Sequence, residues 1–400
     1  MSEQLPHDLQ IEILVRLPVK SLLRFQCVSK SWKSLIRSTD FISMHTNHNE
    51  SINNYAHLVH GSLYRTDSGE EIESRCKLHQ FDDSFSEFQK FEYPSQISQY
   101  VEEVLECRGL ILFNTPPVFF GNRLKPFILW NPAVRMSMTP PRPCIHAPFG
   151  NYFVHGFGFD HKSNDYKVLR MVYVSLGRLT LRAELFKLCT GTWKTVSVSD
   201  DFNYYIPAWP KQAFVNGASH WVGHRSGFRD LAVLCFHMSD EEFRLIKLPD
   251  VLTTVVYHLI SLVVSGGLLS LIYYNGGDGN DVSDAYDSCC IWLMEDYGVI
   301  ESWTKQCTID LRDCGGVGRT FSFRNNRVLL LIETERTNLV LYDLKTNRFI
   351  NLGIRNKGYE LCMNTYIESL VLLDQVNAIP DQYETSSRER IRLTKWLEKA

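Results

Sequence analysis

The chain has 400 residues, 44% of them hydrophobic and 12% aromatic, and a formal net charge of −3. Apolar content of this size suits a globular chain of two or three domains with a large buried core. Acidic and basic residues are interspersed, without the basic run that nucleic acid or a membrane surface attracts. We therefore expect neither nucleic acid nor a membrane as a partner.

The sequence also predicts the compartment. Residues 1–10 lack the basic and then apolar pattern of a signal peptide, and serine and glycine interrupt the longest apolar window, residues 259–274. The 11 cysteines include no CxxC pair, so no zinc site or disulfide framework is indicated. An odd number of cysteines suits a reducing compartment. We expect a cytoplasmic protein, with the nucleus as a further location.

The N-terminal segment has the apolar spacing of three short helices. The first is predicted between Asp8 and Pro18, and one of its faces carries Leu9, Ile13, Leu14 and Leu17. The second begins at Val19 and carries Leu22, Leu23 and Phe25. The third begins near Ser29 and carries Trp32, Leu35 and Ile36. A unit of about forty residues buries too little apolar surface to be stable alone, and its apolar positions cover more than one helix face. We expect a partner protein to cover the rest.

The same segment, LPHDLQIEILVRLPVKSLLRFQCVSKSWKSLI at residues 5–36, resembles an F-box. It has the two Leu-Pro pairs, the EIL and KSLLRF elements, V-x-K-x-W and a final LI; Ile11-Glu12 stands where the family usually has a polar residue and Glu. The resemblance implies binding to the Skp-type adaptor of an SCF ubiquitin ligase. The residues implied for adaptor contact are Leu5, Pro6, Leu9, Ile13, Leu14, Leu17, Pro18, Leu22, Leu23 and Trp32. Those implied for internal packing are Phe25, Val28 and Ile36. The alternative is a helical cap on the next domain.

After Phe41 a pattern of strand, turn and strand recurs. The aromatic residues that precede the turns are Phe81, Trp130, Phe186, Phe236, Trp292 and Tyr342. Their spacing is about fifty residues, which is typical of four-stranded β-propeller blades in the kelch range. Upstream of these aromatics, Gly or Asn separates paired apolar strands, as in tight hairpins.

The C-terminal strand predicts how the ring closes. Residues 359–373 have strand composition but no blade follows them, so we expect them to complete the first blade beside residues 55–64 and remove an exposed edge. The predicted fold class is mainly β, a six-bladed kelch-like β-propeller preceded by a small α-helical F-box domain. An irregular β-sandwich is the alternative.

Two passages resemble the type 1 F-box-associated interaction domain of plants. GFGFDHKSNDYKVLRMVY, at residues 156–173, is similar to its GFGxDxxSxDYKVVR stretch, and ILWNPAVR, at residues 128–135, to its WNPxxR element. The ending TYIESLVLL, at residues 365–373, resembles S-locus and S-haplotype-specific F-box proteins. The resemblances imply an F-box helical domain at 1–45, an F-box-associated β-propeller domain at 46–375 and a charged C-terminal tail at 376–400.

The propeller prediction also indicates where a target protein would bind. Antiparallel strands place short turns on one face and connect on the other through long segments, which we expect near residues 115–126, 143–152, 201–211, 224–230 and 275–288. Aromatic residues and arginines in these segments are typical of interface hot spots. The predicted target-binding residues are Phe119, Phe120, Phe149, Tyr152, Phe202, Tyr204, Tyr205, Trp209, Arg225, Phe228 and Arg229. The alternative for each aromatic residue is packing onto its own blade.

No motif in the sequence indicates catalysis. GGDGNDVSD, from Gly276, lacks the residue order of a calcium loop, and GGVGRT, from Gly315, lacks the ending of a phosphate-binding loop. Neither G-x-S-x-G nor HExxH occurs. We expect no catalytic residue, metal or cofactor, although distant residues can still meet at a propeller's central channel.

The function predicted from these observations is that of a non-catalytic substrate receptor. The F-box would bind a Skp-type adaptor and through it a cullin-based ligase, while the propeller holds a target protein for ubiquitylation and degradation. Holding the target near the conjugating enzyme raises its effective concentration. The alternatives are a non-ligase F-box scaffold and a propeller enzyme.

Overall fold

Four helices precede the first strand, where three were predicted. α1 (His7–Val15), α2 (Val19–Phe25) and α3 (Lys30–Ile36) occupy the predicted places, and the Ser29 hydroxyl caps α3 by accepting a hydrogen bond from the Trp32 N–H. α4 (Thr39–Ser51) was not predicted and continues past the expected boundary at residue 45. Residues 6–52, which contain these helices, are called the helical unit below.

The computed structural model describes most of the chain. The described residues are 6–52, 56–61, 75–80, 85–94, 97, 103–114, 127–145, 152–175, 179–199, 202–207, 211–225, 230–253, 255–256, 259–276, 286–312, 318–324, 327–332, 338–355 and 361–373. The predicted C-terminal tail at 376–400 lies outside them.

The described strands form four sheets of four strands and one of eight, and each sheet contains antiparallel meanders. The eight-stranded sheet joins two meanders through one parallel contact between Ser265 and Phe323. Blade I contains β24 (Leu361–Tyr366), β1 (Ala56–Gly61), β2 (Arg75–His79) and β3 (Glu87–Glu92). Blade II contains β4 (Glu103–Cys107), β5 (Leu110–Asn114), β6 (Phe127–Asn131) and β7 (Met136–Met138). Blade III contains β8 (Tyr152–Asp160), β9 (Asp165–Ser175), β10 (Leu179–Lys187) and β11 (Thr192–Val196).

The second half of the chain has the same plan. Blade IV contains β12 (Ala213–Val215), β13 (Ala218–His224), β14 (Leu231–His237) and β15 (Glu242–Lys247). Blade V contains β16 (Ile260–Ser265), β17 (Leu268–Asn275), β18 (Ser288–Met294) and β19 (Trp303–Asp310). Blade VI contains β20 (Gly318–Arg324), β21 (Arg327–Ile332), β22 (Asn338–Asp343) and β23 (Arg348–Arg355). Short 3-10 helices flank some of these strands, among them η1 (Asp250–Leu252) and η3 (Ile300–Ser302).

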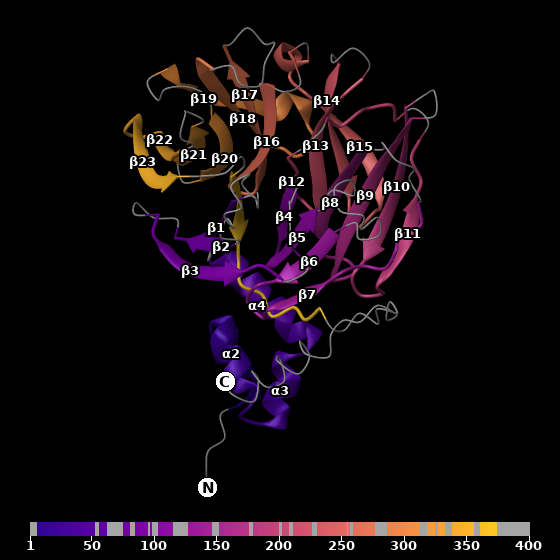
Figure 1. Ribbon diagram of the computed structural model, residues 1–400, viewed down its shortest axis with the longest axis vertical. Helices are drawn as coiled ribbons and strands as arrows, with labels where there is room; N and C mark the ends of the chain where they lie inside the picture. Colours follow the sequence, from indigo (N-terminus) through magenta and orange to yellow (C-terminus); the bar gives the residue numbers. More distant parts are fainter. Residues whose placement is uncertain are drawn as a thin grey trace, which may run out of the picture.

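Figure 1 shows the blades around a common centre, with the helical unit beneath them. Neighbouring blades contact each other mainly through their inner strands: β24 contacts β4, and β4 contacts β8. β8 contacts β13 of blade IV, β12 and β13 contact β16, and β16 and β20 lead back to β24. β24 pairs with β1 along its whole length, from Ala56 opposite Tyr366 to Gly61 opposite Leu361. The predicted closure of the first blade by the C-terminal strand is therefore confirmed, and so is the six-bladed propeller. The strand prediction is wrong over residues 367–373, because β24 ends at Tyr366.

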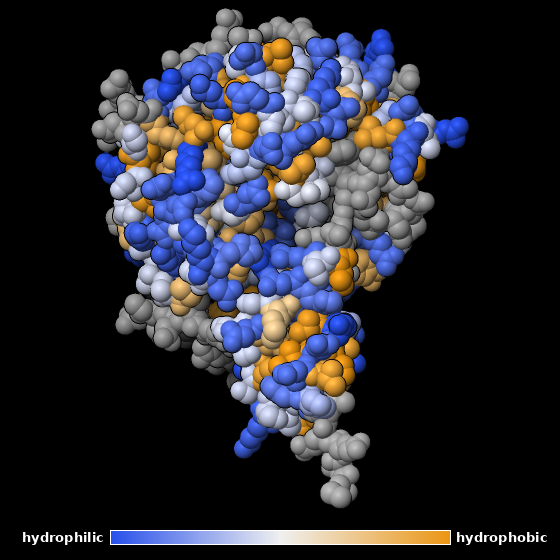
Figure 2. Space-filling view, turned by 180° about the vertical axis from the view of Figure 1, so that it is seen from behind, coloured by the Kyte–Doolittle hydropathy of each residue, from blue (hydrophilic) through white to orange (hydrophobic). Residues whose placement is uncertain are grey.

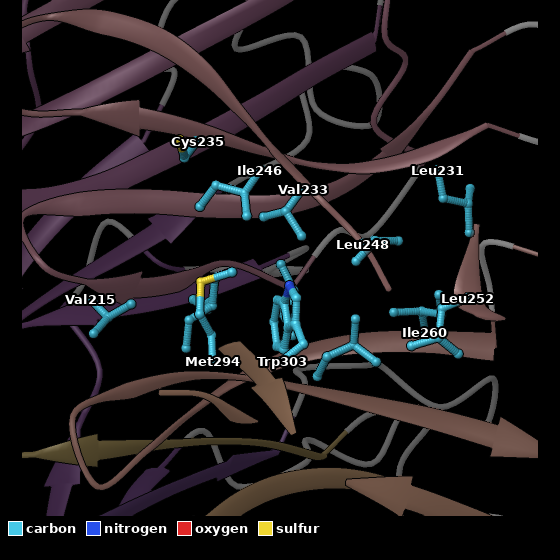
Figure 3. Packing of buried hydrophobic residues seen from close by; sticks show 14 of the residues in the cluster. Val215, Leu231, Val233, Cys235, Ile246, Leu248, Leu252, Ile260, Met294 and Trp303 are labelled. Atoms are coloured by element: carbon cyan, nitrogen blue, oxygen red, sulfur yellow. The ribbon is translucent and has the colours of Figure 1, made fainter. Parts of the chain in front are cut away.

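The core lies between blades. In Figure 3, Met294 and Trp303 of blade V lie close to Val233 and Ile246 of blade IV. The Trp303 indole N–H donates to the Lys247 carbonyl oxygen at 3.2 Å, so this large side chain is buried with its polar atom satisfied.

The GFG pattern of β8 has a packing explanation. A Cβ on Gly158 would lie 2.2 Å from the Phe214 ring, and a Cβ on Gly156 would lie 2.8 Å from the Trp221 ring. Both aromatic residues belong to blade IV. Glycine is needed here because the neighbouring blade's rings lie directly on the strand.

The antiparallel strands divide the propeller's connections between two faces. Turns after the first and third strands of a blade lie on one face, which we call the turn face; connections after the second and fourth strands lie on the other, the loop face. β1 is the second strand of blade I, so the chain enters it at the turn face when it comes from α4. β24 is the first strand of the same blade, so the chain also leaves it at the turn face. Both junctions with the helical unit therefore lie on the turn face. Within the described residues, no helix has the length and apolar character needed to cross a bilayer.

Candidate functional site

The helical unit exposes apolar side chains, as its composition predicted. Leu9 and Ile13 on α1 are 46% and 51% exposed, and Val28, in the turn between α2 and α3, is 63% exposed. Pro6 and Pro18 are also exposed, while Leu17 and Trp32 are half-buried. Figure 2 shows hydrophobic residues gathered on the surface of this unit. Exposed apolar clusters of this kind mark protein-binding surfaces.

The prediction that Val28 packs internally is wrong. The Val28 N–H donates to the Phe25 carbonyl oxygen in the turn that ends α2, and the side chain points outward from that turn. Ile36 is buried as predicted, and Phe25 is half-buried against Trp32. Leu5, another predicted contact, lies outside the described residues.

Three of the predicted adaptor contacts form the core of the helical unit. Leu14, Leu22 and Leu23 are buried in one apolar cluster. Their packing partners in that cluster are Val19, Ile36, Phe41, Val134 and Leu370. In this conformation the three leucines shape the unit, and its accessible apolar side chains include Leu9 and Ile13 on α1, Val28 in a turn and Met44 on α4.

Polar contacts attach α4 to the turn face. Arg108, in the turn between β4 and β5, donates to Asn47 and lies 3.3 Å from the Glu50 carboxylate. Its guanidinium is 4.3 Å from the centre of the Phe159 ring, and the side chain is 7% exposed. The Ser43 hydroxyl donates to Asn164 at 3.0 Å in the next blade's turn. The helical unit is thus held by blades II and III on one face of the propeller.

The DxxSxDYK stretch forms an ionic cluster between blades III and IV, which we call the clasp. Lys167 Nζ lies 2.9 Å from Asp160 and 3.0 Å from Glu241, donates to the Met238 carbonyl oxygen at 2.7 Å, and is 3% exposed. Burial alone would raise the pKa of Asp160, but hydrogen bonds from Ser163, Ser239 and Lys167 lower it. Burial alone would likewise raise the pKa of Glu241, but hydrogen bonds from Lys187, Lys194 and Lys167 lower it to about 2. Every hydrogen-bond donor of Lys167 is used. Because Asp160 belongs to blade III whereas Met238 and Glu241 belong to blade IV, the residues of the DxxSxDYK stretch join these two blades.

The described aromatic residues predicted for target binding pack onto their own blades. The Phe202 ring lies 5.0 Å from Phe243, and Tyr205 exchanges two backbone hydrogen bonds with His224, at 2.8 and 2.9 Å. Tyr204 is 7% exposed beneath the guanidinium of Arg225.

The other predicted target-binding residues are Arg225, Tyr152 and six residues that the structure does not describe. Arg225, predicted to pair with a target carboxylate, lies 3.5 Å from Asp230 of its own loop. Tyr152 begins β8, but its side chain is not described. Six predicted residues lie outside the described residues: Phe119, Phe120, Phe149, Trp209, Phe228 and Arg229. Target binding by these residues stays a prediction.

The described residues bring no three His, Cys, Asp or Glu side chains together as a metal site. Residues 277–285 and 313–317, which include most of the two glycine-rich passages considered above, lie outside the described part of the chain.

Comparison with known families fits both parts of the molecule. The family model described as "F-box associated beta propeller domain" matches residues 92–373, and the model described as "F-box domain" matches residues 2–43. The first match covers more than half of the chain. The chain belongs to the F-box-associated β-propeller family. The helical unit is its F-box, extended by α4.

Similar proteins occur in Arabidopsis thaliana. "F-box protein CPR1" is 24% identical over 96% of this chain and 94% of its own length. "F-box/kelch-repeat protein At3g23880" is 26% identical over 86% of this chain and 89% of its own length. "F-box protein At3g07870" is 26% identical over 88% and 87%, respectively. The similarity therefore spans the F-box and the propeller together, and the resemblance to plant F-box proteins with this domain is confirmed.

Sequence reasoning missed the residues that join the F-box to the propeller. Arg108 was visible only as part of a short Arg-Gly turn, and Asn47 and Glu50 lay on a helix that was not predicted. α4 has few apolar residues and its pattern is correspondingly weak. Ser38, which caps α4 by accepting from the Phe41 N–H at 3.2 Å, was the available signal.

Glu106, beside this junction, predicts a pH dependence of stability. Its carboxylate accepts from the Gly109 N–H at 2.8 Å, and desolvation, with the nearby charge of Glu50, raises its pKa to about 8 against the opposing charge of Arg108. A group whose pKa is raised by folding stabilises the fold below its unfolded pKa, and that contribution is lost as pH rises through the folded value.

We therefore expect the contribution of Glu106 to the free energy of unfolding to fall between about pH 5 and pH 8, with a slope of at most ~1.4 kcal/mol per pH unit. Glu106→Gln keeps the acceptor for Gly109 but cannot ionise, so it should remove this contribution and leave the pH dependence that other groups cause. Urea unfolding at several pH values measures the difference between the two proteins. Equal slopes would contradict the assignment.

Proposed function

We propose that this protein is a substrate-recognition subunit of an SCF-type ubiquitin ligase, and that it does no chemistry itself. The supporting observation is the position of the F-box on the turn face, held by the turns that contain Arg108, Val134 and Asn164. This arrangement leaves the loop face of the propeller, on the opposite side, open to a target protein.

The proposed partners are a Skp-type adaptor, through it a cullin-based ligase, and one target protein on the loop face. Leu9 and Ile13 provide the exposed apolar anchors for the adaptor. This proposal includes the ligase role and a cytoplasmic or nuclear location, without nucleic-acid or membrane partners. It also includes the division of the chain into domains at residues 1–45, 46–375 and 376–400. A target at the loop face would meet the conjugating enzyme by proximity.

The S-locus resemblance of residues 365–373 does not extend the proposal to self-incompatibility. In the structure these residues contact the F-box and blade II, for example through hydrogen bonds between Asn131 and the carbonyl oxygens of Ser369 and Val371. Residues with such internal contacts support the framework, and their resemblance carries no information about the target.

A ubiquitylation experiment separates the receptor from the non-ligase scaffold. The intact protein and a Leu9→Asp, Ile13→Asp variant are used to capture propeller-binding proteins, and each complex is then supplied with adaptor, cullin, activating and conjugating enzymes. If the protein is a receptor, the intact protein and the variant should capture the same proteins. The captured proteins should become ubiquitylated only in the complex with the intact protein. Captured proteins that stay unmodified with the intact, adaptor-bound protein would support the scaffold instead.

A further inference from the structure

The segment after the last strand, residues 367–373, lies between the F-box and the propeller. Its side chains alternate between the two. Leu370 and Leu372 pack into the F-box cluster, whereas Val371 and Leu373 pack into the cluster of blades II and III. This period of two is that of an extended chain with a different partner on each side. We call residues 367–373 the strap.

Blade II holds the strap through its backbone. The Asn131 amide donates to the carbonyl oxygens of Ser369 and Val371, both at 2.9 Å. Gly109, in the turn between β4 and β5, permits close approach, because a Cβ there would lie 2.4 Å from Ser369 Cβ and 2.7 Å from the Ile367 carbonyl oxygen. Gly109 also has a φ of +84°, which other residues rarely adopt. The Asn of the WNP element therefore fixes the path of the strap.

The other side of the strap completes the F-box. Leu370 is 2% exposed and shares a cluster with Leu14, Leu22 and Ile36 from three different F-box helices. The Glu368 carboxylate accepts from the Val19 N–H at 3.3 Å, at the first residue of α2, where Pro18 offers no side-chain cap. A helical unit this small gains much of its stability from such added contacts.

The strap also continues directly from β24, which closes the propeller by pairing with β1. The same segment of chain therefore closes blade I and fills the F-box core. We propose that the strap couples propeller closure to the adaptor-binding form of the F-box, so that the F-box is fully formed only in a chain whose ring is closed. This inference rests on the proposed function in taking the F-box as the adaptor site.

Matched truncations on the two sides of the strap test this coupling in the full chain. Leu370→Ala removes contacts with the F-box, and Val371→Ala removes contacts with the blades while keeping the backbone bonds to Asn131. Hydrogen exchange measured by mass spectrometry follows peptides from α1–α3 and from blades II–V. We expect Leu370→Ala to speed exchange in α1–α3 about tenfold or more and to leave blades III–V within about twofold. Val371→Ala should also speed exchange in α1–α3, by less than Leu370→Ala, because it loosens the strap from the blades while Asn131 still holds the backbone.

Adaptor affinity provides the second readout, with Leu370→Asp as the stronger variant. We expect its affinity for a purified Skp-type adaptor to fall about tenfold or more, because a buried carboxylate opens the F-box core. If Leu370→Asp does not fold, the hydrogen-exchange rates of Leu370→Ala still test the coupling. Unchanged α1–α3 exchange in Leu370→Ala would overturn the coupling, and so would unchanged α1–α3 exchange in Val371→Ala, because coupling must carry a change on the blade side of the strap to the F-box. Failure of the parent chain to bind adaptor would count against the proposed function alone, because exchange is measured without adaptor.

Discussion

Lys167→Met should lower the free energy of unfolding by about 3–5 kcal/mol, since it leaves the buried carboxylate of Asp160 without its cation. Asp160, 3% exposed, loses its only ion-pair partner among the described residues, and Glu241 keeps Lys187 and Lys194. Methionine retains most of the apolar length of lysine, so the lost charge dominates the effect. Chemical denaturation followed by tryptophan fluorescence measures it.

Lys162→Met is the matched control. Lys162 lies 2.9 Å from Asp240 on the same face of the propeller, but its side chain is 73% exposed. Exposed ion pairs contribute about 1 kcal/mol or less, so the control should resemble the parent protein. Equal destabilisation by the two substitutions would show that burial of Lys167 does not determine its contribution.

The double substitution Leu9→Asp, Ile13→Asp should weaken adaptor binding about a hundredfold or more, while the thermal midpoint stays within about 2 °C. Both side chains are about half exposed on α1, so charges there disturb the apolar contact with a partner more than the fold. Binding is measured by titration calorimetry with a purified Skp-type adaptor, and folding by circular dichroism.

Leu245→Asp serves as the control for the double variant. Leu245 is an exposed leucine, 41% accessible, on β15 of the propeller. Its substitution places one such charge on an exposed leucine away from the F-box and should leave adaptor affinity unchanged. If the Leu9→Asp, Ile13→Asp variant binds the adaptor as tightly as the parent protein, α1 is not part of the adaptor site.

Much of the fold was predictable because the sequence repeats its own pattern. Trp130, Phe186, Phe236, Trp292 and Tyr342 each lie in the third strand of a blade, as their spacing of about fifty residues indicated. The closing role of β24, within the stretch predicted as a strand at residues 359–373, followed from having a strand without a blade. These features depend on local composition and period, which a single sequence contains.

Contacts between distant segments were not predictable in the same way. Leu370 was predicted to lie in the closing strand, but that strand ends at Tyr366, and nothing local to Leu370 indicates packing beside Leu14 and Leu22. Arg108 and Glu50 likewise form their ion pair across the F-box junction, which depends on how two units meet. On the loop face, Tyr204 and Tyr205 carried hot-spot composition, yet the bridge to His224 and the cover by Arg225 turn them toward their own blades.

Titration of the purified, folded protein with a purified Skp-type adaptor measures whether the F-box of this chain binds an adaptor. We expect a one-to-one complex with a Kd of about 1 μM or tighter, corresponding to about 8 kcal/mol of binding free energy. No binding at adaptor concentrations of about 100 μM, by a chain whose propeller and F-box are both folded, would contradict it.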